Sequence, residues 1–482
     1  MTATVTQWET VVGLEVHSEL RTATKLFCGC RNSFGEDPNV NICPVCLGLP
    51  GSLPVLNRMA VEYAMRIGTA LHCRIQASIF HRKNYFYPDM PKDYQISQYD
   101  LPINVQGWLN LPDGRRVGIE RAHLEEDTGK TTHVGGGGRI HEADYSLVDY
   151  NRAGVPLVEI VSAPDLRSAE EARAYVDELR SILVATGASD GKMEEGSLRV
   201  DANVSVRPAG STQFGTRCEI KNMNSLRSLG RAIEHEAARQ VTLLAEGGTV
   251  VQETRHWDEG AGRTGTMRSK EEAYDYRYFP EPDLVPVDPS PEWISAVAAA
   301  MPRLPAARRA AVAAASGMAP EADAVATVVR LGLDGYVQTV VENGAGEEEA
   351  AIAVRRLANE VAAEVDSADR LTAPAFARLV RMESEGSLTP AQARTVLKDL
   401  LDSGGDPDQV AARHGFEAMA AGDLESVVDQ AVSAHPEEWA RFAAGEDKLM
   451  GFFVGHIRSA TGGRADLKAA STLLRSRRGQ AG

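Results

Sequence analysis

The feature that most constrains the fold is an alternation of residue types with a period of two. Between Leu198 and Arg207 apolar residues alternate with polar or charged ones, and residues 12–20 and 217–221 repeat the pattern. Successive side chains of a β-strand point to opposite faces, so the pattern predicts strands with one apolar and one charged face. We therefore expect a largely antiparallel sheet that is packed on one side only.

The chain changes character near residue 280. Before it, glycine, aromatic residues and alternating strands dominate; after it, Ala, Arg and Glu do. Seven prolines between 280 and 305 predict a linker, because proline interrupts both helices and ladders. Ser168–Leu183 and a segment that begins at Thr389 and ends at Gly404 predict helices. The expected fold class is α+β, with domains at 1–290, 291–405 and 406–482.

Composition narrows the class of protein further. With 43% apolar and 24% charged residues, the 482-residue chain is typical of a globular protein of about three domains. No window approaches the roughly 20 apolar residues of a membrane span, and the start lacks a secretion signal. We expect no membrane association and a cytoplasmic location, where cysteines are thiols or metal ligands. The net charge of −16 argues against a nucleic-acid-coated protein but permits local basic patches or cation-binding carboxylates.

Four cysteines form two close pairs, Cys28 with Cys30 and Cys43 with Cys46. Two such pairs suit a tetrahedral Zn²⁺ site, and four thiolates leave no open position, so the site would be structural. The single residue between Cys28 and Cys30 is fewer than usual for zinc ligands. Four unrelated buried thiols are the alternative.

Carboxylates recur on the charged strand faces. Glu15 and His17 share one face, and further acids follow at Glu125, Glu126, Asp127, Glu194, Glu195, Asp201 and Glu219. Mg²⁺ prefers oxygen ligands, so these acids, beside Arg199, Arg217 and Lys221, suggest a site for metal-bound phosphate. A solvated face with surface ion pairs is the alternative. Gly129-Lys130-Thr131-Thr132 looks like the end of a P-loop, but Leu124 stands where its first glycine belongs, so we exclude that motif.

Two segments have features of nucleic-acid binding. Residues 81–95 interleave aromatic residues with Arg82, Lys83 and Lys92, and residues 274–283 have the same character. Rings stack on bases while cations meet phosphates; a packed structural loop is the alternative. From Lys448 onward the chain has seven basic residues and one acid, which suggests either a grip on phosphates or complements to helix C-termini.

Several long stretches together resemble one known family, the B subunits of the bacterial aspartyl/glutamyl-tRNA amidotransferase. They are residues 12–17 (VGLEVH), 43–54 (CPVCLGLPGSLP), 82–89 (RKNYFYPD), 94–100 (YQISQYD), 123–127 (HLEED), 192–203 (KMEEGSLRVDAN), 219–222 (EIKN) and 275–283 (DYRYFPEPD). The resemblance is thinner from 300 to 440. It returns at residues 451–455 (GFFVG), which look like that family's tail domain.

The resemblance implies an enzyme that corrects misacylated tRNA. Such a protein uses ATP and Mg²⁺ to phosphorylate the side-chain carboxylate of Glu-tRNA(Gln) or Asp-tRNA(Asn). Ammonia made on a partner amidase then displaces phosphate to give the amide, and a small third protein completes the complex. By this resemblance residues 1–290 form a cradle-like catalytic domain with a zinc knuckle, and residues 406–482 bind tRNA.

Roles follow from the matching positions and the chemistry. We assign Mg²⁺ to Glu15, His17, Glu125 and Glu219, with Glu126, Glu194 and Asp201 as alternates. Catalysis is assigned to Glu125, Glu126, Asp201, Lys221 and Arg199, and ATP binding to Lys83, Arg199, Lys221 and Asn203. Tyr85, Tyr87 and Lys92 would position the tRNA end. A zinc-stabilised RNA-binding scaffold without chemistry is the second hypothesis.

Overall fold

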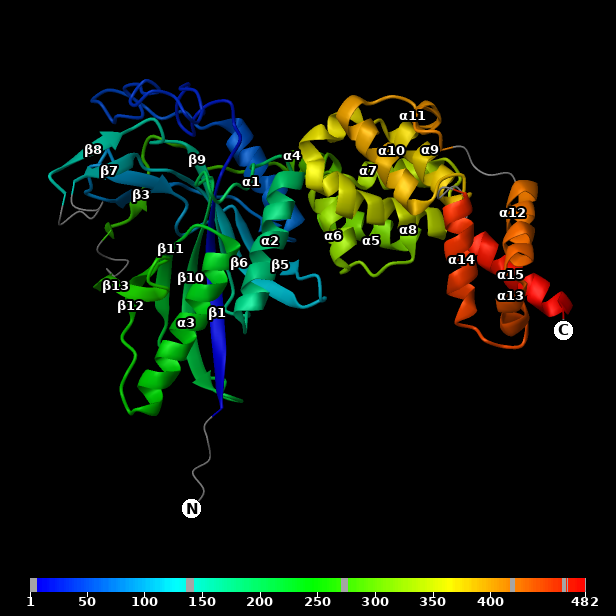
Figure 1. The fold of residues 1–482 in the computed structure, drawn as a ribbon. Helices are drawn as coiled ribbons and strands as arrows, with labels where there is room; N and C mark the ends of the chain where they lie inside the picture. The colour runs from blue at the N-terminus through cyan, green and yellow to red at the C-terminus, as the bar shows by residue number, and fades with distance from the viewer. Residues whose placement is uncertain are drawn as a thin grey trace, which may run out of the picture. The chain divides into compact units, whose positions relative to one another are not determined.

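The computed structural model divides into two compact units, Met1–Pro305 and Ala306–Gly482, called here the N-terminal and C-terminal units (Figure 1). It describes residues 7–135, 143–269, 276–416, 421–461, 465 and 467–481. Tyr274, Asp275, Arg464 and Asp466, which belong to motifs noted above, lie outside the described residues. Within the described part, no helix is both long and apolar enough to cross a bilayer.

The N-terminal unit is built on a sheet of twelve described strands. They are β1 (Trp8–Glu19), β2 (Arg74–Ile75), β3 (His81–Asn84), β4 (Tyr94–Ser97), β5 (Asn104–Asn110), β6 (Arg116–Glu126), β9 (Pro156–Ser162), β10 (Leu198–Pro208), β11 (Cys218–Met223), β12 (Glu253–Asp258), β13 (Arg263–Ser269) and β14 (Phe279–Pro280). The order is β13-β12-β11-β10-β1-β9-β6-β4-β3-β14, with β5 pairing β6 and β2 pairing β5. Strands β7 (Lys130–Val134) and β8 (Tyr145–Asp149) pair separately.

The expected antiparallel, one-sided sheet is confirmed. Every described pair is antiparallel except β11 with β12. Strand β1 lies between β9 and β10, and its Val12, Leu14 and Val16 are buried. Because the strand alternates, Glu15 and His17 lie on the opposite face, where Glu15 is in register with Asp201.

Helices cover the apolar face. They are α1 (Arg58–Ala70), α2 (Ala169–Ala185), α3 (Leu226–Ala245) and α4 (Pro291–Ala299). Helices α2 and α3 lie side by side against the sheet (Figure 1), with α2 contacting β1 and α3 contacting β10. The predicted helix is α2, and its N-cap is Ser168, whose side chain accepts a hydrogen bond from Glu171 N. The charged face is thereby left for the site.

The proline-rich segment is not the linker that its composition predicts. Val287 forms a β-bridge with Ser78, and helix α4 packs on α1 with Val297 in the same core. Pro291 occupies the first turn of α4, where the missing N–H costs no hydrogen bond. The prolines therefore begin helices and end strands within the N-terminal unit, and the division between the units comes at residue 305.

The C-terminal unit is helical, as expected. Its described helices are α5 (Pro305–Ser316), α6 (Asp323–Arg330), α7 (Asp334–Glu342), α8 (Glu347–Arg356), the π-helical turn Leu357–Val361, the 3₁₀ segment Ala362–Arg370, α9 (Ala373–Ser384), α10 (Pro390–Ser403), α11 (Pro407–Arg413), α12 (Ala421–Ala434), α13 (Pro436–Ala443), α14 (Leu449–Ala460) and α15 (Leu467–Ala481). One core spans residues 312–411 and another spans 424–474. Helix α10 begins at its predicted cap, Thr389, and ends at Gly404.

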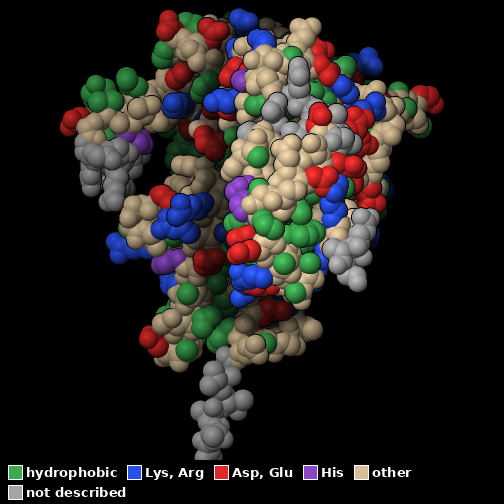
Figure 2. Space-filling model, turned by 45° about the vertical axis from the view of Figure 1, so that its right-hand side comes forward, with side chains coloured by type: hydrophobic (Ala, Val, Ile, Leu, Met, Phe, Trp, Pro, Cys, Tyr) green, Lys and Arg blue, Asp and Glu red, His purple; other side chains and the backbone are tan. Residues whose placement is uncertain are grey.

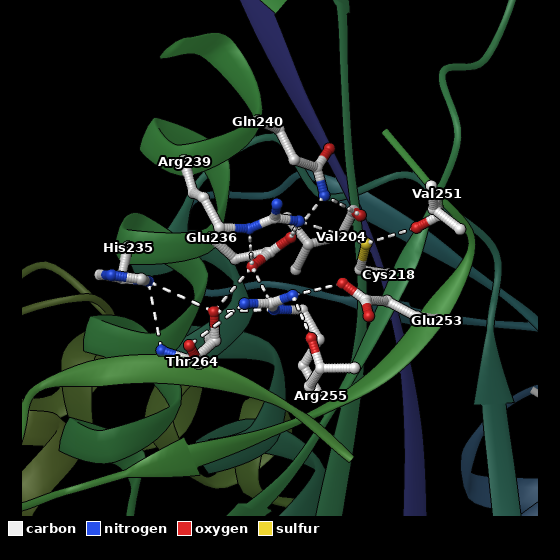
Figure 3. Close-up of polar contacts among 11 residues, drawn as sticks. Val204, Cys218, His235, Glu236, Arg239, Gln240, Val251, Glu253, Arg255 and Thr264 are labelled. Atoms are coloured by element: carbon white, nitrogen blue, oxygen red, sulfur yellow. Dashed lines mark hydrogen bonds and ion pairs between the residues drawn. The ribbon is translucent and has the colours of Figure 1, made fainter. Parts of the chain in front are cut away.

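A buried ionic network fastens helix α3 to the sheet (Figure 3). The Glu236 side chain is fully buried and accepts hydrogen bonds from Arg239, Gln240 and Thr264, each at 2.9 Å. Arg255 of β12 approaches it to 3.3 Å. Burial opposes the charge, but hydrogen bonds led by that of Arg239 hold the pKa of Glu236 below its ordinary value. The carboxylate thus joins α3, β12 and β13.

We predict that Glu236→Gln lowers the free energy of unfolding of the N-terminal unit by about 3–5 kcal/mol, because Arg239 loses its carboxylate partner and the buried Arg255 keeps only Glu253 among the described acids. Urea denaturation followed by tryptophan fluorescence measures this, since four of the five tryptophans lie in that unit. Glu234→Gln, an exposed acid on the same helix, is the control and should change stability by less than about 0.5 kcal/mol. Equal effects of the two substitutions would contradict this role.

Candidate functional site

Two histidines and two glutamates converge on the charged face of the sheet. His17 Nε2 of β1 lies 3.6 Å from Glu159 Oε2 of β9 and 3.9 Å from Glu125 Oε1 of β6. His123 Nε2 lies 3.6 Å from Glu159 and 3.8 Å from Glu125. Ligand atoms of His17, Glu125 and Glu159 all lie within 4.8 Å of one another, which is close enough to share one ion. We call these four residues the His–Glu cluster.

The electrostatics of the His–Glu cluster favour a cation. Burial disfavours a charged His17, but the carboxylates of Glu159 and Glu125 outweigh burial and raise the His17 pKa to about 9. Burial likewise opposes the charge of Glu159, yet His123 and His17 hold the Glu159 pKa well below its ordinary range. The Glu159 carboxylate is therefore stabilised in its ionised form by nearby positive charge, which a divalent cation also supplies.

A second group of acids lies on the β10–β11 side of β1. We call Glu15, Asp201 and Glu219 the Glu15 cluster. Asn203 Nδ2 donates to Glu15 Oε1 at 2.9 Å. Lys221 Nζ contacts Asp201 Oδ2 at 2.5 Å and Glu219 Oε1 at 3.2 Å. Burial, followed by the charges of Glu159 and Glu219, raises the pKa of Glu15. Lys221 therefore pairs with two carboxylates, Asp201 and Glu219. The raised pKa of Glu15 shows that its own charge is less well compensated.

Strand β12 orients Glu219, the member of the Glu15 cluster that lies on β11. Thr254 Oγ1 donates to Glu219 Oε2 at 2.9 Å. The next residue, Arg255, points to the opposite face of the sheet, where it contacts Glu236. The buried network on the helix side therefore holds the strand that positions Glu219 on the charged side.

A third group places arginines beside the His–Glu cluster. Arg199 Nη2 bonds to Asp127 Oδ2, and Arg152 Nε lies 3.5 Å from the same oxygen. Glu19 is close by: burial and the Asp127 charge raise its pKa to about 7, although Arg199 opposes the shift. Two guanidinium groups at the edge of an acidic face are suited to oxygen anions such as phosphate.

Three buried polar atoms on this face lack a hydrogen-bond partner among the described residues: Arg199 Nε, Asn203 Oδ1 and His123 Nδ1. Buried polar groups are normally paired, so these three atoms are available to a ligand or to ordered water. Where the molecular surface is drawn in Figure 2, acidic and basic side chains are interspersed over it.

Three predicted residues lie elsewhere. Glu126 follows Glu125 on β6 and so points to the other side, where Lys92 Nζ contacts its two carboxylate oxygens at 2.5 and 2.6 Å. Ile96 N also donates to Glu126, and both members of the pair are at least 90% buried. Glu194 is exposed in the loop before β10. The structure does not bring these three residues to the charged face.

An aromatic patch borders the charged face. Strand β14 pairs with β3, which brings residues 276–278 beside residues 83–85. Lys83 Nζ lies 4.7 Å from the ring centre of Tyr276. The rings of Tyr85 and Tyr87 stack at 4.5 Å, and those of Tyr99 and Tyr278 at 4.0 Å. Burial, with the nearby charge of Glu125, raises the pKa of Tyr278, so the patch adjoins the His–Glu cluster.

The four predicted cysteine ligands converge. Cys46 Sγ lies 3.9 Å from Cys28, 3.7 Å from Cys30 and 3.5 Å from Cys43. A tetrahedral ion with Zn–S bonds of about 2.3 Å separates its sulfurs by about 3.8 Å, so the cluster fits zinc. The hydrogen-bonded Cys28 thiol and the Lys25 ammonium hold the pKa of Cys46 below its ordinary value, although burial opposes this. Such a site can join two segments of chain without an open catalytic position.

Comparison with known proteins gives the family. A model of the GatB/GatE catalytic domain matches residues 10–295, and a model described as the GatB domain matches residues 335–477. The chain belongs to the GatB family. The B subunits of the aspartyl/glutamyl-tRNA(Asn/Gln) amidotransferase from Carboxydothermus hydrogenoformans and Frankia casuarinae are 46% and 49% identical to it. The alignments cover 98% of this chain and 99% and 96% of those proteins, which confirms the resemblance seen in the motifs.

Sequence reasoning missed several residues of this GatB-family site. Glu159 is the one residue of β9 that is not fully buried. A lone acid within the apolar run PLVEIVS is the signal that could have identified it. His123 begins the motif HLEED of residues 123–127, but was assigned no role from the sequence. Glu19 follows the same alternation as Glu15 and His17 on β1 but was assigned no role. Arg152 and Thr254 have no local pattern to distinguish them, because only tertiary pairing brings them to the site.

We predict that the purified protein contains about one zinc ion per chain and that Cys46→Ser lowers this content to near zero, because it removes one of the four thiolates that the tetrahedral site needs. Elemental analysis measures the content, and thermal melting with a chelator measures the stability that zinc supplies. Cys73→Ser is the matched control, because Cys73 lies outside the cluster and its substitution should leave the zinc content unchanged. Full zinc content in Cys46→Ser would refute the site.

Proposed function

We propose that this chain is the tRNA-binding and activating component of an ATP-dependent amidotransferase. It would convert Glu-tRNA(Gln), Asp-tRNA(Asn) or both to the amidated forms. The observation that carries the proposal is the meeting of the His–Glu cluster, the Glu15 cluster and the arginine-bound Asp127 on one sheet face beside an aromatic patch. Family membership supports the same reaction, since the relatives are named for it.

The charged face is suited to activating a carboxylate. A carboxylate is a poor electrophile, and ATP with Mg²⁺ supplies the chemistry that turns it into an acyl phosphate. Glu15, His17, Glu125, Glu159 and Glu219 would hold the metal. Asp201 and Asn203 hold Lys221 and Glu15 in place and border the same space. Asp201 is therefore kept as an alternate ligand.

Phosphate and substrate would be bound by the surrounding cations and rings. Arg199 and Lys221 lie at the two ends of the acidic face, each already paired with a carboxylate. Lys83 lies beside the aromatic patch and would meet phosphate there. The stacked Tyr85 and Tyr87 would position the terminal bases of the tRNA, because base stacking is sequence-tolerant. Because the aromatic patch adjoins the His–Glu cluster, a tRNA end stacked there would direct its amino acid toward Glu125.

We further propose the division of labour along the chain that the sequence suggested, with catalysis in residues 1–290, a helical domain in 291–405 and tRNA binding in 406–482. The separate cores of residues 312–411 and 424–474 support a distinct tail, and they put its division from the helical domain between residues 411 and 424. A partner amidase, the A component of the same enzyme, would supply ammonia, and a small C component would complete the complex. The location would be cytoplasmic, and zinc would be structural.

A zinc-stabilised RNA-binding scaffold without chemistry is the competing function. It requires the acids on the sheet face to be solvated surface groups. The burial of Glu125 and Glu219, at 5% and 8% exposure, disfavours that hypothesis. Release of phosphate from ATP that depends on misacylated tRNA would separate the two functions.

We predict that Glu125→Gln lowers the rate of amide formation at least ~100-fold while tRNA affinity changes less than about threefold, because a charge aimed at the reacting centre is lost. The assay uses the complex reconstituted with its amidase and small partner proteins, misacylated tRNA, glutamine and ATP. Glu120→Gln, an exposed acid on the same strand, is the control and should behave as wild type. A parallel loss of tRNA binding in Glu125→Gln would mean that the residue is structural.

We predict that removing residues 417–482 weakens tRNA binding and reduces its dependence on salt. The cut is placed there because Val410 and Ala411 belong to the preceding core. The exposed pair substitution Arg458→Glu with Arg475→Glu should reduce the slope of log Kd against log salt by about 1 for each phosphate that is no longer bound. Arg477 and Arg478 are poorer choices, because they pair with Asp429 and Asp447. Unchanged salt dependence in both variants would remove the tail from tRNA binding.

A further inference from the structure

Lys25 is a fully buried lysine with no acidic partner among the described residues. Its side chain is 0% exposed. The ammonium donates to two backbone carbonyls, Asn41 O at 2.8 Å and Tyr150 O at 3.4 Å. No Asp or Glu among the described residues lies within 4.0 Å of it. Carbonyl dipoles satisfy its hydrogen bonds but do not neutralise its charge.

A buried charge without a counter-charge is costly, so its presence needs an explanation. Glu126 is one acid near Lys25, since both side chains approach Gly154: a Cβ built on that glycine would lie 3.7 Å from Lys25 Cδ and 3.9 Å from Glu126 Oε2. That carboxylate is already bound by Lys92. The neighbourhood of Lys25, as far as the structure describes it, therefore has no free carboxylate to balance it.

The cysteine cluster lies on the other side of the same small space. The same Cβ on Gly154 would lie 3.9 Å from Cys46 Cβ, and Lys25 N donates to Cys30 O at 2.9 Å. Four thiolates around one Zn²⁺ leave a net charge of −2. Such a dianion is the counter-charge that the geometry offers to the Lys25 ammonium.

We propose that Lys25 is the counter-cation of the zinc–thiolate cluster and a determinant of its zinc affinity. The inference rests on the proposed structural zinc site. Lys25 also links the cysteine cluster to the rest of the N-terminal unit, because Asn41 lies between Cys30 and Cys43 and Tyr150 follows β8. The backbone N–H of Asn41 strengthens this link by donating to Asn151 Oδ1 at 2.8 Å, beside Tyr150. Lys25 would thus both balance the charge of the cluster and hold its loop in place.

The test compares zinc affinity and stability in variants of the full chain. Lys25→Met keeps most of the hydrocarbon and removes both charge and donors, whereas Lys25→Gln removes the charge but keeps N–H donors on a side chain that is one atom shorter. Lys192→Met, which removes an exposed lysine paired with Glu195, is the control. Zinc dissociation constants are measured by competition with a chromogenic chelator, and melting temperatures are measured with zinc and after its removal.

We expect both Lys25 variants to bind zinc about 10- to 100-fold more weakly than wild type, as outer-sphere substitutions at metal sites do. The rise in melting temperature on adding zinc should shrink in both, because the charge stabilises only the metal-bound form. Two results would overturn the proposal: unchanged zinc affinity in both variants, or loss in Lys25→Met that Lys25→Gln restores, which would show that hydrogen bonds alone matter. A wild-type protein that binds no zinc would instead refute the zinc site itself.

Discussion

The central constraint on this structure is the repulsion among carboxylates that lie close together on a half-buried sheet face. Acids at such distances cannot all stay ionised unless positive charge compensates them. The fold supplies some of it through His17, Lys221 and Arg199, each in contact with one or two carboxylates. It leaves Glu15 with a raised pKa, and three buried polar atoms on this face have no partner among the described residues. That shortfall is what a metal-bound polyphosphate would fill.

Much of the surrounding structure serves to hold this face in register. Residues from β1, β6, β9, β10 and β11 converge only because the strands are antiparallel and correctly paired. Helix α3 contributes from the other side, since Glu236 anchors Arg255 and thereby the strand whose Thr254 orients Glu219. The cysteine cluster contributes through the loop that contains Asn41, which is bonded to the segment after β8. Distant buried groups thus fix the positions of the charged ones.

The alternation of residues was sufficient to predict the sheet, its one-sided packing and the position of Glu15 and His17 on its charged face. Local signals were also sufficient for α2 and α10, where Ser168 and Thr389 are the caps, and for the cysteine cluster. Consecutive acids were misleading: Glu125 and Glu126 occupy opposite faces, although the motif presents them together. Glu159 was missed because its strand is otherwise apolar, and Arg152 because only tertiary pairing brings it to Asp127. The prolines of residues 280–305 signalled breaks in structure but not whether the broken pieces pack.

The central claim is that the acidic face binds metal and nucleotide together. The most direct measurement is anomalous diffraction from crystals of the complex grown with Mn²⁺ in place of Mg²⁺ and a non-hydrolysable ATP analogue. The account predicts manganese peaks within ligand distance of carboxylates from the His–Glu and Glu15 clusters, with the phosphates directed toward Arg199 or Lys221. Bound analogue with its manganese at another surface, and the acidic face empty, would contradict it.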